Sequence, residues 1–84
     1  MNMELDIVCT PSAFKHGVSE ADIRHAVKTA RYDRMMEGFD DKTLLLGFNT
    51  KGNPLEVIYH RVGDNGMYVF HAMKCRNTYL PLLL

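Results

Sequence analysis

Residues 55–76 read LEVIYHRVGDNGMYVFHAMKCR, two strand-like runs on either side of a turn signal. Asn65-Gly66 is a strong hairpin signal, because both residue types tolerate a positive φ. Apolar residues alternate with other residues in both runs, as expected for strands that bury one face. The stretch therefore predicts an antiparallel hairpin at the centre of the fold.

The length of the turn decides which side chains share a face of this hairpin. A two-residue loop at Asn65-Gly66 places His60 directly opposite His71, with Cβ atoms within about 5.5 Å of each other. A four-residue loop over residues 63–66 pairs Ile58 with His71 and still keeps both histidines on one face. Only an odd-length loop separates them. We therefore expect a face that carries two histidines.

The two faces of the hairpin differ in polarity. The expected core face is apolar and carries Leu55, Val57, Tyr59, Phe70 and Ala72. The opposite face is mixed and carries Glu56, Ile58, His60, Val69, His71, Met73 and Cys75. If the loop at residues 50–53 is also even in length, the core face gains Leu44, Leu46 and Phe48, and the mixed face gains Thr43, Leu45 and Gly47.

The chain before the hairpin predicts helices and further strands. Thr10-Pro11 is typical of a helix start and Gly17 of a helix end, which indicates a short helical turn over residues 11–16. Ser19, with Asp22 three residues later, resembles a capping box and opens a helix that runs to about Arg31. Extended segments are expected at residues 3–8, 35–39 and 43–49. The predicted fold is α+β, with N-terminal helices packed on one face of a three- to four-stranded antiparallel sheet.

Length and composition indicate one folded domain over residues 1–84. Of the residues, 46% are hydrophobic and 24% are charged, which is ordinary for a globular protein. Cys9 and Cys75 have no metal-ligand or disulfide spacing, and no stretch approaches the ~20 apolar residues of a membrane span. The N-terminus lacks the pattern of a signal peptide, so we expect a cytoplasmic protein without a metal or other cofactor.

Charge gives no general attraction toward nucleic acid, because ten Lys and Arg balance ten Asp and Glu. RNA binding would therefore depend on local groups of cations. Arg24, Lys28 and Arg31 are spaced to form a basic stripe on the predicted helix. The alternative interpretation of this stripe is a solvated helix face.

The mixed face suggests a chemistry for the two histidines. His60 and His71 with a nearby Glu56 could supply a general base and a general acid for phosphodiester cleavage without a metal. Phosphate charge would be neutralised by cations at or beyond the strand ends: Arg61, Lys74 and Arg76. The alternative is a pair of half-buried histidines that hydrogen-bond to the backbone or to tyrosines and only stabilise the fold.

Several segments, in their order along the chain, resemble a known family. They are the extended start ELDIV, then KHGVSEADIRHAV with KHGVS at residues 15–19, LLLGF, KGNPLEVIYHR and VFHAMKCR. The chain resembles the BrnT-like toxins of bacterial type II toxin–antitoxin pairs, small relatives of the RelE ribonuclease fold. The resemblance implies an antiparallel sheet packed by helices, an RNA substrate, no cofactor, and a cognate antitoxin that covers the active surface.

The last strand departs from the family pattern and marks a divergent member. Ala72 matches the family's alanine and Lys74 a following cation. His71 stands where serine is common, and Met73 stands where arginine is expected. The tail LPLLL replaces a charged helix, although Tyr79 matches its aromatic residue.

The apolar tail at residues 79–84 supports a second hypothesis. A contiguous apolar surface usually marks an interface, so the chain could be a non-catalytic protein-interaction module that forms a homodimer through this tail. The same tail could instead pack on the chain's own sheet.

Overall fold

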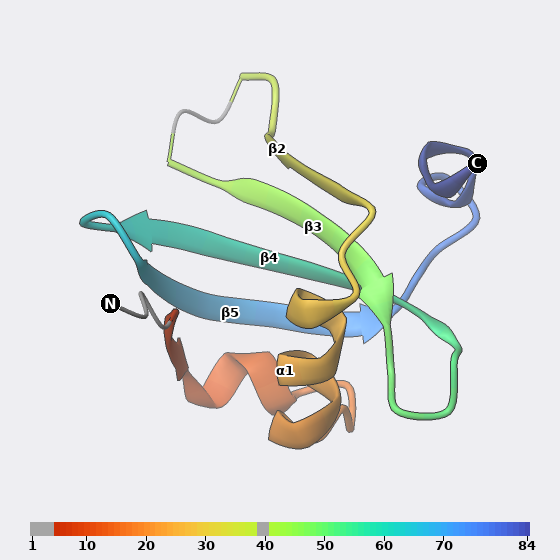
Figure 1. The fold of residues 1–84 in the computed structure, drawn as a ribbon, viewed down its shortest axis with the longest axis horizontal. Coiled ribbons are helices and arrows are strands. Elements are labelled where there is room, and N and C mark those ends of the chain that lie inside the picture. The colour runs from red at the N-terminus through yellow and green to blue at the C-terminus, as the bar shows by residue number, and fades with distance from the viewer. Residues whose placement is uncertain (1–4, 39–40) are drawn as a thin grey trace.

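The computed structural model describes residues 5–38 and 41–84 (Figure 1). Its elements are, in order, the strand β1 (Asp6–Cys9), the 3-10 turn η1 (Pro11–Phe14), the helix α1 (Glu20–Lys28), the strands β2 (Tyr32–Met35), β3 (Thr43–Phe48), β4 (Pro54–Val62) and β5 (Gly66–Lys74), and the 3-10 turn η2 (Leu80–Leu83). Among these residues, no helix is long and apolar enough to span a membrane.

The sheet has five strands in the order β1-β5-β4-β3-β2. β1 runs parallel to β5, and the other neighbours are antiparallel. The α+β class is confirmed, whereas the expected sheet of three or four antiparallel strands is wrong. Pairing of β1 with β5 joins segments about 60 residues apart, which no local turn signal encodes.

The edge strand β2 begins earlier than the sequence predicted, at Tyr32 instead of residue 35. Its sequence, YDRM, is mostly exposed and lacks alternating apolar residues, so periodicity could not place it. The parts of the expected strands that fall on residues 3, 4 and 39 lie outside the described residues.

The helix α1 has the predicted cap at its start and ends three residues before Arg31. The Ser19 hydroxyl accepts a hydrogen bond from the Asp22 backbone N–H at 3.1 Å. At the other end, the backbone N–H of Arg31 donates to the Leu46 carbonyl of β3 at 2.9 Å. Arg31 therefore already pairs with the sheet and not with the preceding helical turn.

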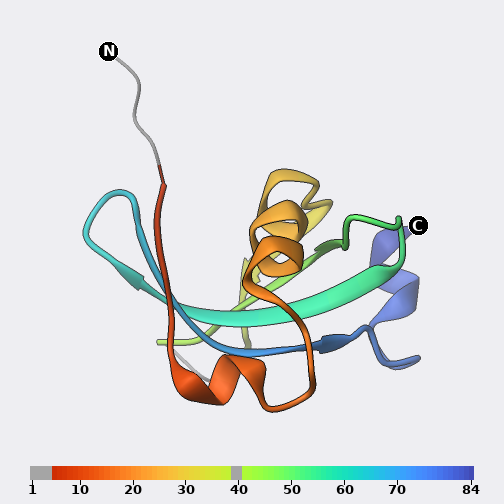
Figure 2. The same cartoon turned by 90° about the horizontal axis from the view of Figure 1, so that it is seen from below.

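Both faces of the sheet are covered. α1 packs on one face and η1 closes the edge at β5, and together they enclose a core of Ala13, Ile23, Ala26, Leu45, Leu55, Val57, Tyr59, Met67, Val69 and Ala72. Figure 2 shows α1 lying on one side of the twisted β4 and β5 ribbons. The other face carries a smaller cluster of Leu44, Leu46 and Cys75, which is covered by Tyr32, Met36, Ile58, Tyr79, Leu80 and Leu83. The C-terminal tail therefore packs on its own sheet.

The β3–β4 loop is odd in length, so the conditional assignment of β3 is reversed. Phe48 pairs with Pro54, which leaves the five residues 49–53 in the loop. The Asn49 side-chain oxygen accepts the backbone N–H groups of Lys51 and Asn53, both at 2.9 Å, and so closes this loop. Leu45 consequently faces α1, whereas Leu44 and Leu46 face the tail.

The β4–β5 turn is also odd, because Val62 pairs with Gly66 across three residues. A register shift then lies between Ile58, which pairs with His71, and Tyr59, which pairs with Val69. This bulge in β5 inserts one extra residue and restores the parity that the turn had changed. Both histidines of the hairpin lie on the same face, as expected, but the expected cross-strand pair of histidines is wrong: His60 is opposite Tyr68.

The bulge also moves two apolar residues between the faces. Val69 is fully buried in the core beneath α1, although strict alternation had placed it on the mixed face. Phe70 lies on the mixed face, where its ring stacks on His60 with centroids 4.5 Å apart.

The closest approach of α1 to the sheet occurs at Gly47. A Cβ atom at this position would overlap the backbone carbonyl of Ala26. We expect Gly47→Ala to lower the free energy of unfolding by about 3 kcal/mol, because backbone meets backbone and no side chain can move aside. Urea denaturation measures the change.

The control for this substitution is Gly63→Asn. Gly63 has a φ of 63° and open space around its Cα, and asparagine tolerates that conformation. Its substitution should cost less than about 1 kcal/mol. Equal stability of Gly47→Ala and the wild type would contradict the close approach of α1 and β3.

Candidate functional site

Glu56 is the centre of a polar cluster on the face of the sheet opposite α1. Its carboxylate is fully buried. Oε2 accepts hydrogen bonds from Arg76 Nη2 at 2.7 Å and lies 2.9 Å from His71 Nε2. Oε1 accepts from Arg76 Nε and from the Arg76 backbone N–H, both at 3.0 Å. One carboxylate therefore fixes a histidine and an arginine from two different segments.

Two opposing effects set the pKa of Glu56. Burial raises this pKa. The hydrogen bonds from the Arg76 side chain and backbone and from His71, together with the charge of Arg76, lower it by more than burial raises it. The net pKa of Glu56 lies below its ordinary value. The carboxylate likewise raises the pKa of Arg76 through its hydrogen bonds and charge. Glu56 and Arg76 are therefore an ion pair near neutral pH.

Two aromatic rings complete the cluster. The His16 ring meets the His71 ring edge to face, with centroids 5.5 Å apart and an interplanar angle of 71°. The Arg76 guanidinium lies over the Tyr79 ring, 5.5 Å from its centroid. The His71 side chain is 21% exposed and that of Arg76 is 51% exposed, so both remain accessible from solvent.

The turn η1 brings His16 to this place. The Thr10 backbone N–H donates to the Val69 carbonyl at 2.9 Å, and the Ser12 hydroxyl donates to the Phe70 carbonyl at 2.8 Å. These bonds attach η1 to the edge of β5 just before His71. The sequence placed position 16 only at the end of the predicted helical turn before Gly17, where a cationic side chain suits the negative end of the helix dipole, although the KHGVS segment that supports the family resemblance contains His16.

His60 lies apart from the cluster. Four residues along β4 separate it from Glu56, a distance of roughly 13 Å at strand spacing. Its Nδ1 lies 2.5 Å from the Asp41 carbonyl oxygen, and its ring stacks on Phe70. Of the expected group Glu56, His60 and His71, the structure brings Glu56 and His71 into contact, and the histidine ring that meets His71 is that of His16.

Of the six predicted phosphate-binding cations, only Arg76 contacts the cluster. Arg24, whose Nη2 donates to the Ile7 carbonyl at 3.1 Å, and Lys28 belong to α1, across the sheet from Glu56. The guanidinium of Arg31 lies over the Phe48 ring, 5.7 Å from its centroid. The other two, Arg61 and Lys74, line separate pockets.

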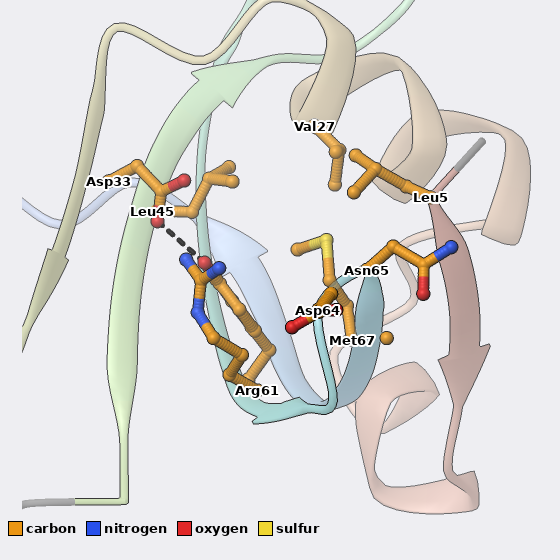
Figure 3. A pocket seen from close by; sticks show the side chains of 10 residues that line it. Leu5, Val27, Asp33, Leu45, Arg61, Asp64, Asn65 and Met67 are labelled. Carbon is orange, nitrogen blue, oxygen red and sulfur yellow. Dashed lines mark hydrogen bonds between the residues drawn. The ribbon is translucent and has the colours of Figure 1, made fainter. Parts of the chain in front are cut away.

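The pocket beside Arg61 has a volume of about 100 Å³ and lies between α1, β1 and the hairpin turn (Figure 3). The Tyr59 hydroxyl donates to Asp33 Oδ1 at 2.7 Å at its edge. Burial, the hydrogen bond to Asp33 and the Asp33 charge raise the pKa of Tyr59 to about 12. Tyr59 therefore stays protonated at neutral pH and holds β2 to β4, which is a structural role.

No group of three or more His, Cys, Asp or Glu side chains within residues 5–38 and 41–84 is arranged to hold a metal ion. The described cluster offers ring nitrogens, a carboxylate and a guanidinium. These groups can transfer protons and bind an anion.

Comparisons with known proteins find similarity in the fold but none in the sequence. No protein-family model matches the chain. No curated protein matches it by sequence. Among solved structures, it is similar to the ribonuclease toxin BrnT of Brucella abortus, with a TM-score of 0.64 and 19% identity over 87% of this chain and 99% of that one. The chain therefore has a BrnT-like fold with a divergent sequence.

The buried ion pair predicts a specific dependence of stability on pH. Because the pKa of Glu56 is below its ordinary value of 4.5, the carboxylate stabilises the fold above that pH, and this contribution is lost as the pH falls through the lowered pKa. Glu56→Gln should lower the free energy of unfolding by about 2 kcal/mol at pH 7 and by progressively less below pH 4.5. Urea denaturation at several pH values measures both effects.

Glu20→Gln is the matched control, since the Glu20 carboxylate pairs with Arg24 on the exposed surface. It should cost less than about 0.5 kcal/mol at any pH. A Glu56→Gln variant that loses the same free energy at pH 3 and pH 7 would show that the carboxylate charge is not what stabilises this cluster.

Proposed function

We propose that this protein is the toxin of a bacterial toxin–antitoxin pair and cleaves RNA in the cytoplasm by metal-independent acid–base catalysis. The observation that carries the proposal is the Glu56 carboxylate, which holds the partly exposed side chains of His71 and Arg76 together on the face of the sheet opposite α1. The similar BrnT structure is described as a ribonuclease toxin.

His71 is the proposed general base. Glu56 accepts from Nε2–H, and this hydrogen bond favours the tautomer in which Nδ1 carries the lone pair. Nδ1 would take the proton from a ribose 2′-hydroxyl, whose oxygen then attacks the adjacent phosphorus. The bond from phosphorus to the 5′-oxygen of the next nucleotide breaks. The products are a 2′,3′-cyclic phosphate and a free 5′-hydroxyl.

His16 and Arg76 supply the other two roles. His16, next to His71, would donate the proton that the leaving 5′-oxygen needs. Nε and Nη2 of Arg76 hydrogen-bond to Glu56, and its half-exposed guanidinium can still present its other edge to a phosphate oxygen. Charge that develops on phosphorus in the transition state would be stabilised there.

The proposed protein partner is a cognate antitoxin that covers this cluster. The expectation follows from the family resemblance, and the exposed parts of His71 and Arg76 are the surface it would bury. A partner with acidic side chains would compete with the RNA phosphate for Arg76.

The alternative function is a non-catalytic interaction module that forms a homodimer through the C-terminal tail. One observation favours it: Leu82 and Leu84 remain exposed although the neighbouring Leu80 and Leu83 pack on the sheet. The exposed side chains could meet those of a second copy.

Deletion of residues 80–84 distinguishes a tail that packs on its own sheet from a tail that forms a dimer interface. The deletion uncovers Leu44 and Leu46, so we expect the thermal midpoint to fall by several degrees while the protein remains monomeric. Light scattering of the full and truncated chains gives their masses. A full chain of twice the truncated mass would favour the interaction module.

His71→Ala tests the ribonuclease directly. Expression of the wild type without an antitoxin should arrest growth and degrade RNA. Because the variant lacks the proposed base, its cleavage rate should fall by about 100-fold or more and the arrest should be relieved. Cleavage of a labelled RNA by the purified protein gives the rate, and circular dichroism verifies the fold.

His16→Ala should lower the cleavage rate similarly, and His60→Ala is the matched control. His60 lies on the same face but outside the cluster, so its removal should leave the rate within about threefold of the wild type. If His60→Ala is the inactive variant and His16→Ala is active, the assignment of the second histidine is wrong. If the wild type leaves RNA intact, the ribonuclease proposal fails.

A further inference from the structure

A second pocket, with a volume of about 440 Å³, lies at the end of the sheet where β4 begins and β5 ends. Its size is in the range of small-molecule sites. Pro54, Leu55 and Leu80 give it apolar walls. Asn53, Asn77 and Lys74 add polar groups to these walls.

Two hydrogen bonds donated by backbone N–H groups fix the two sides of this pocket. The Asn49 side chain accepts from the Asn53 backbone N–H at 2.9 Å and so shapes the β3–β4 loop. The Cys75 backbone N–H donates to the Pro54 carbonyl at 3.0 Å and ties the end of β5 to the start of β4. Figure 1 shows that this loop and the segment after β5 leave the sheet at the same end.

Asn49 also lines the pocket, and its side chain is committed to the β3–β4 loop, but three other polar side chains of the pocket are not committed in this way. The side chains of Asn53, Asn77 and Lys74 form no hydrogen bond or ion pair with any residue in 5–38 or 41–84. Each amide offers a donor and an acceptor, and the lysine offers three donors. Apolar walls with a few polar groups are typical of small-molecule sites, in which the polar groups fix the orientation of the ligand.

The pocket is joined to the Glu56 cluster through the segment at residues 75–77. Two of its lining residues, Cys75 and Asn77, flank Arg76 in the chain, and consecutive Cα atoms are about 3.8 Å apart. Arg76 is held by Glu56 through its backbone and side chain. A ligand with a phosphate at Arg76 can therefore place its adjoining group in the pocket.

We propose that this pocket binds the base next to the scissile phosphate of single-stranded RNA and prefers adenine. The proposal rests on the ribonuclease function proposed above. An asparagine amide matches the adjacent donor and acceptor of adenine with two hydrogen bonds, and single-stranded RNA exposes this edge. Pro54 and Leu80 would contact the face of the base, and Lys74 would bind a neighbouring phosphate.

Nuclear magnetic resonance titration of the full-length protein tests this assignment. The probes are adenosine 5′-monophosphate, uridine 5′-monophosphate and ribose 5-phosphate. The adenosine nucleotide should shift the side-chain amide signals of Asn53 and Asn77 and should bind at least about fivefold more tightly than the other two. Asn53→Ala and Asn77→Ala should each weaken its binding by about tenfold, the loss of one to two hydrogen bonds.

Matched controls are Asn65→Ala, in the turn at the other end of the hairpin, and Lys51→Ala, which lies in the β3–β4 loop but does not line the pocket. Neither should change the affinity for the adenosine nucleotide. Equal affinities for adenosine nucleotide and ribose 5-phosphate, or no effect of either pocket asparagine, would overturn the proposal. The proposal would also be overturned if no nucleotide shifted the signals of the pocket residues and only a protein segment bound there.

Cleavage assays distinguish this inference from the function on which it rests. In oligonucleotides that differ at one base, Asn53→Ala and Asn77→Ala should retain cleavage and lose the preference for adenine. Cleavage by the wild type without any base preference overturns the base pocket alone. Adenosine nucleotide binding through these amides without RNA cleavage refutes the ribonuclease and, with it, the placement of the base beside a scissile phosphate.

Discussion

The rest of the structure depends on the hydrogen bonds and the positive charge that compensate the buried carboxylate of Glu56. Glu56 is fully buried in β4, and an unpaired charge there would cost several kcal/mol. Arg76 and His71 supply the compensation from β5 and the segment that follows it. The same bonds fix the direction in which the chain leaves the sheet. They therefore set the path of the tail, the wall of the neighbouring pocket, and the orientation of the two groups proposed to act on RNA.

The bulge in β5 makes this compensation possible. The three-residue turn alone would have directed His71 toward α1, into the apolar core. The extra residue at the bulge rotates the strand, so that Val69 and Met67 still fill the core while His71 faces Glu56. The bulge thus lies in the strand that must both fill the core, with Val69, and present His71 to Glu56 on the opposite face.

Local patterns predicted the fold class and half of the candidate site. The Ser19 cap and the hairpin follow from signals within a few residues of each other. The shared face of Glu56 and His71 was expected from an even-length turn, but it arises from an odd turn followed by the bulge in β5. The lengths of the two loops could not be predicted from local patterns. Asn65-Gly66 fits several turn types, and the β3–β4 loop is closed by the Asn49 side chain. His16 was missed because its neighbour in space is 55 residues away in sequence. A histidine before a glycine resembles an ordinary helix end.

The sequence by itself determined a small α+β domain, a capped helix, a central hairpin, and the presence of carboxylate, imidazole and guanidinium groups near it. These properties depend on alternation, capping and turn propensity, which act over a few residues. Only the tertiary structure decided that β1 pairs with β5 and that the tail covers its own sheet. It alone placed His16, and not His60, beside His71. The physical reason is that such contacts join distant segments and depend on the parity of loops and bulges, where one added residue reverses the direction of every side chain that follows.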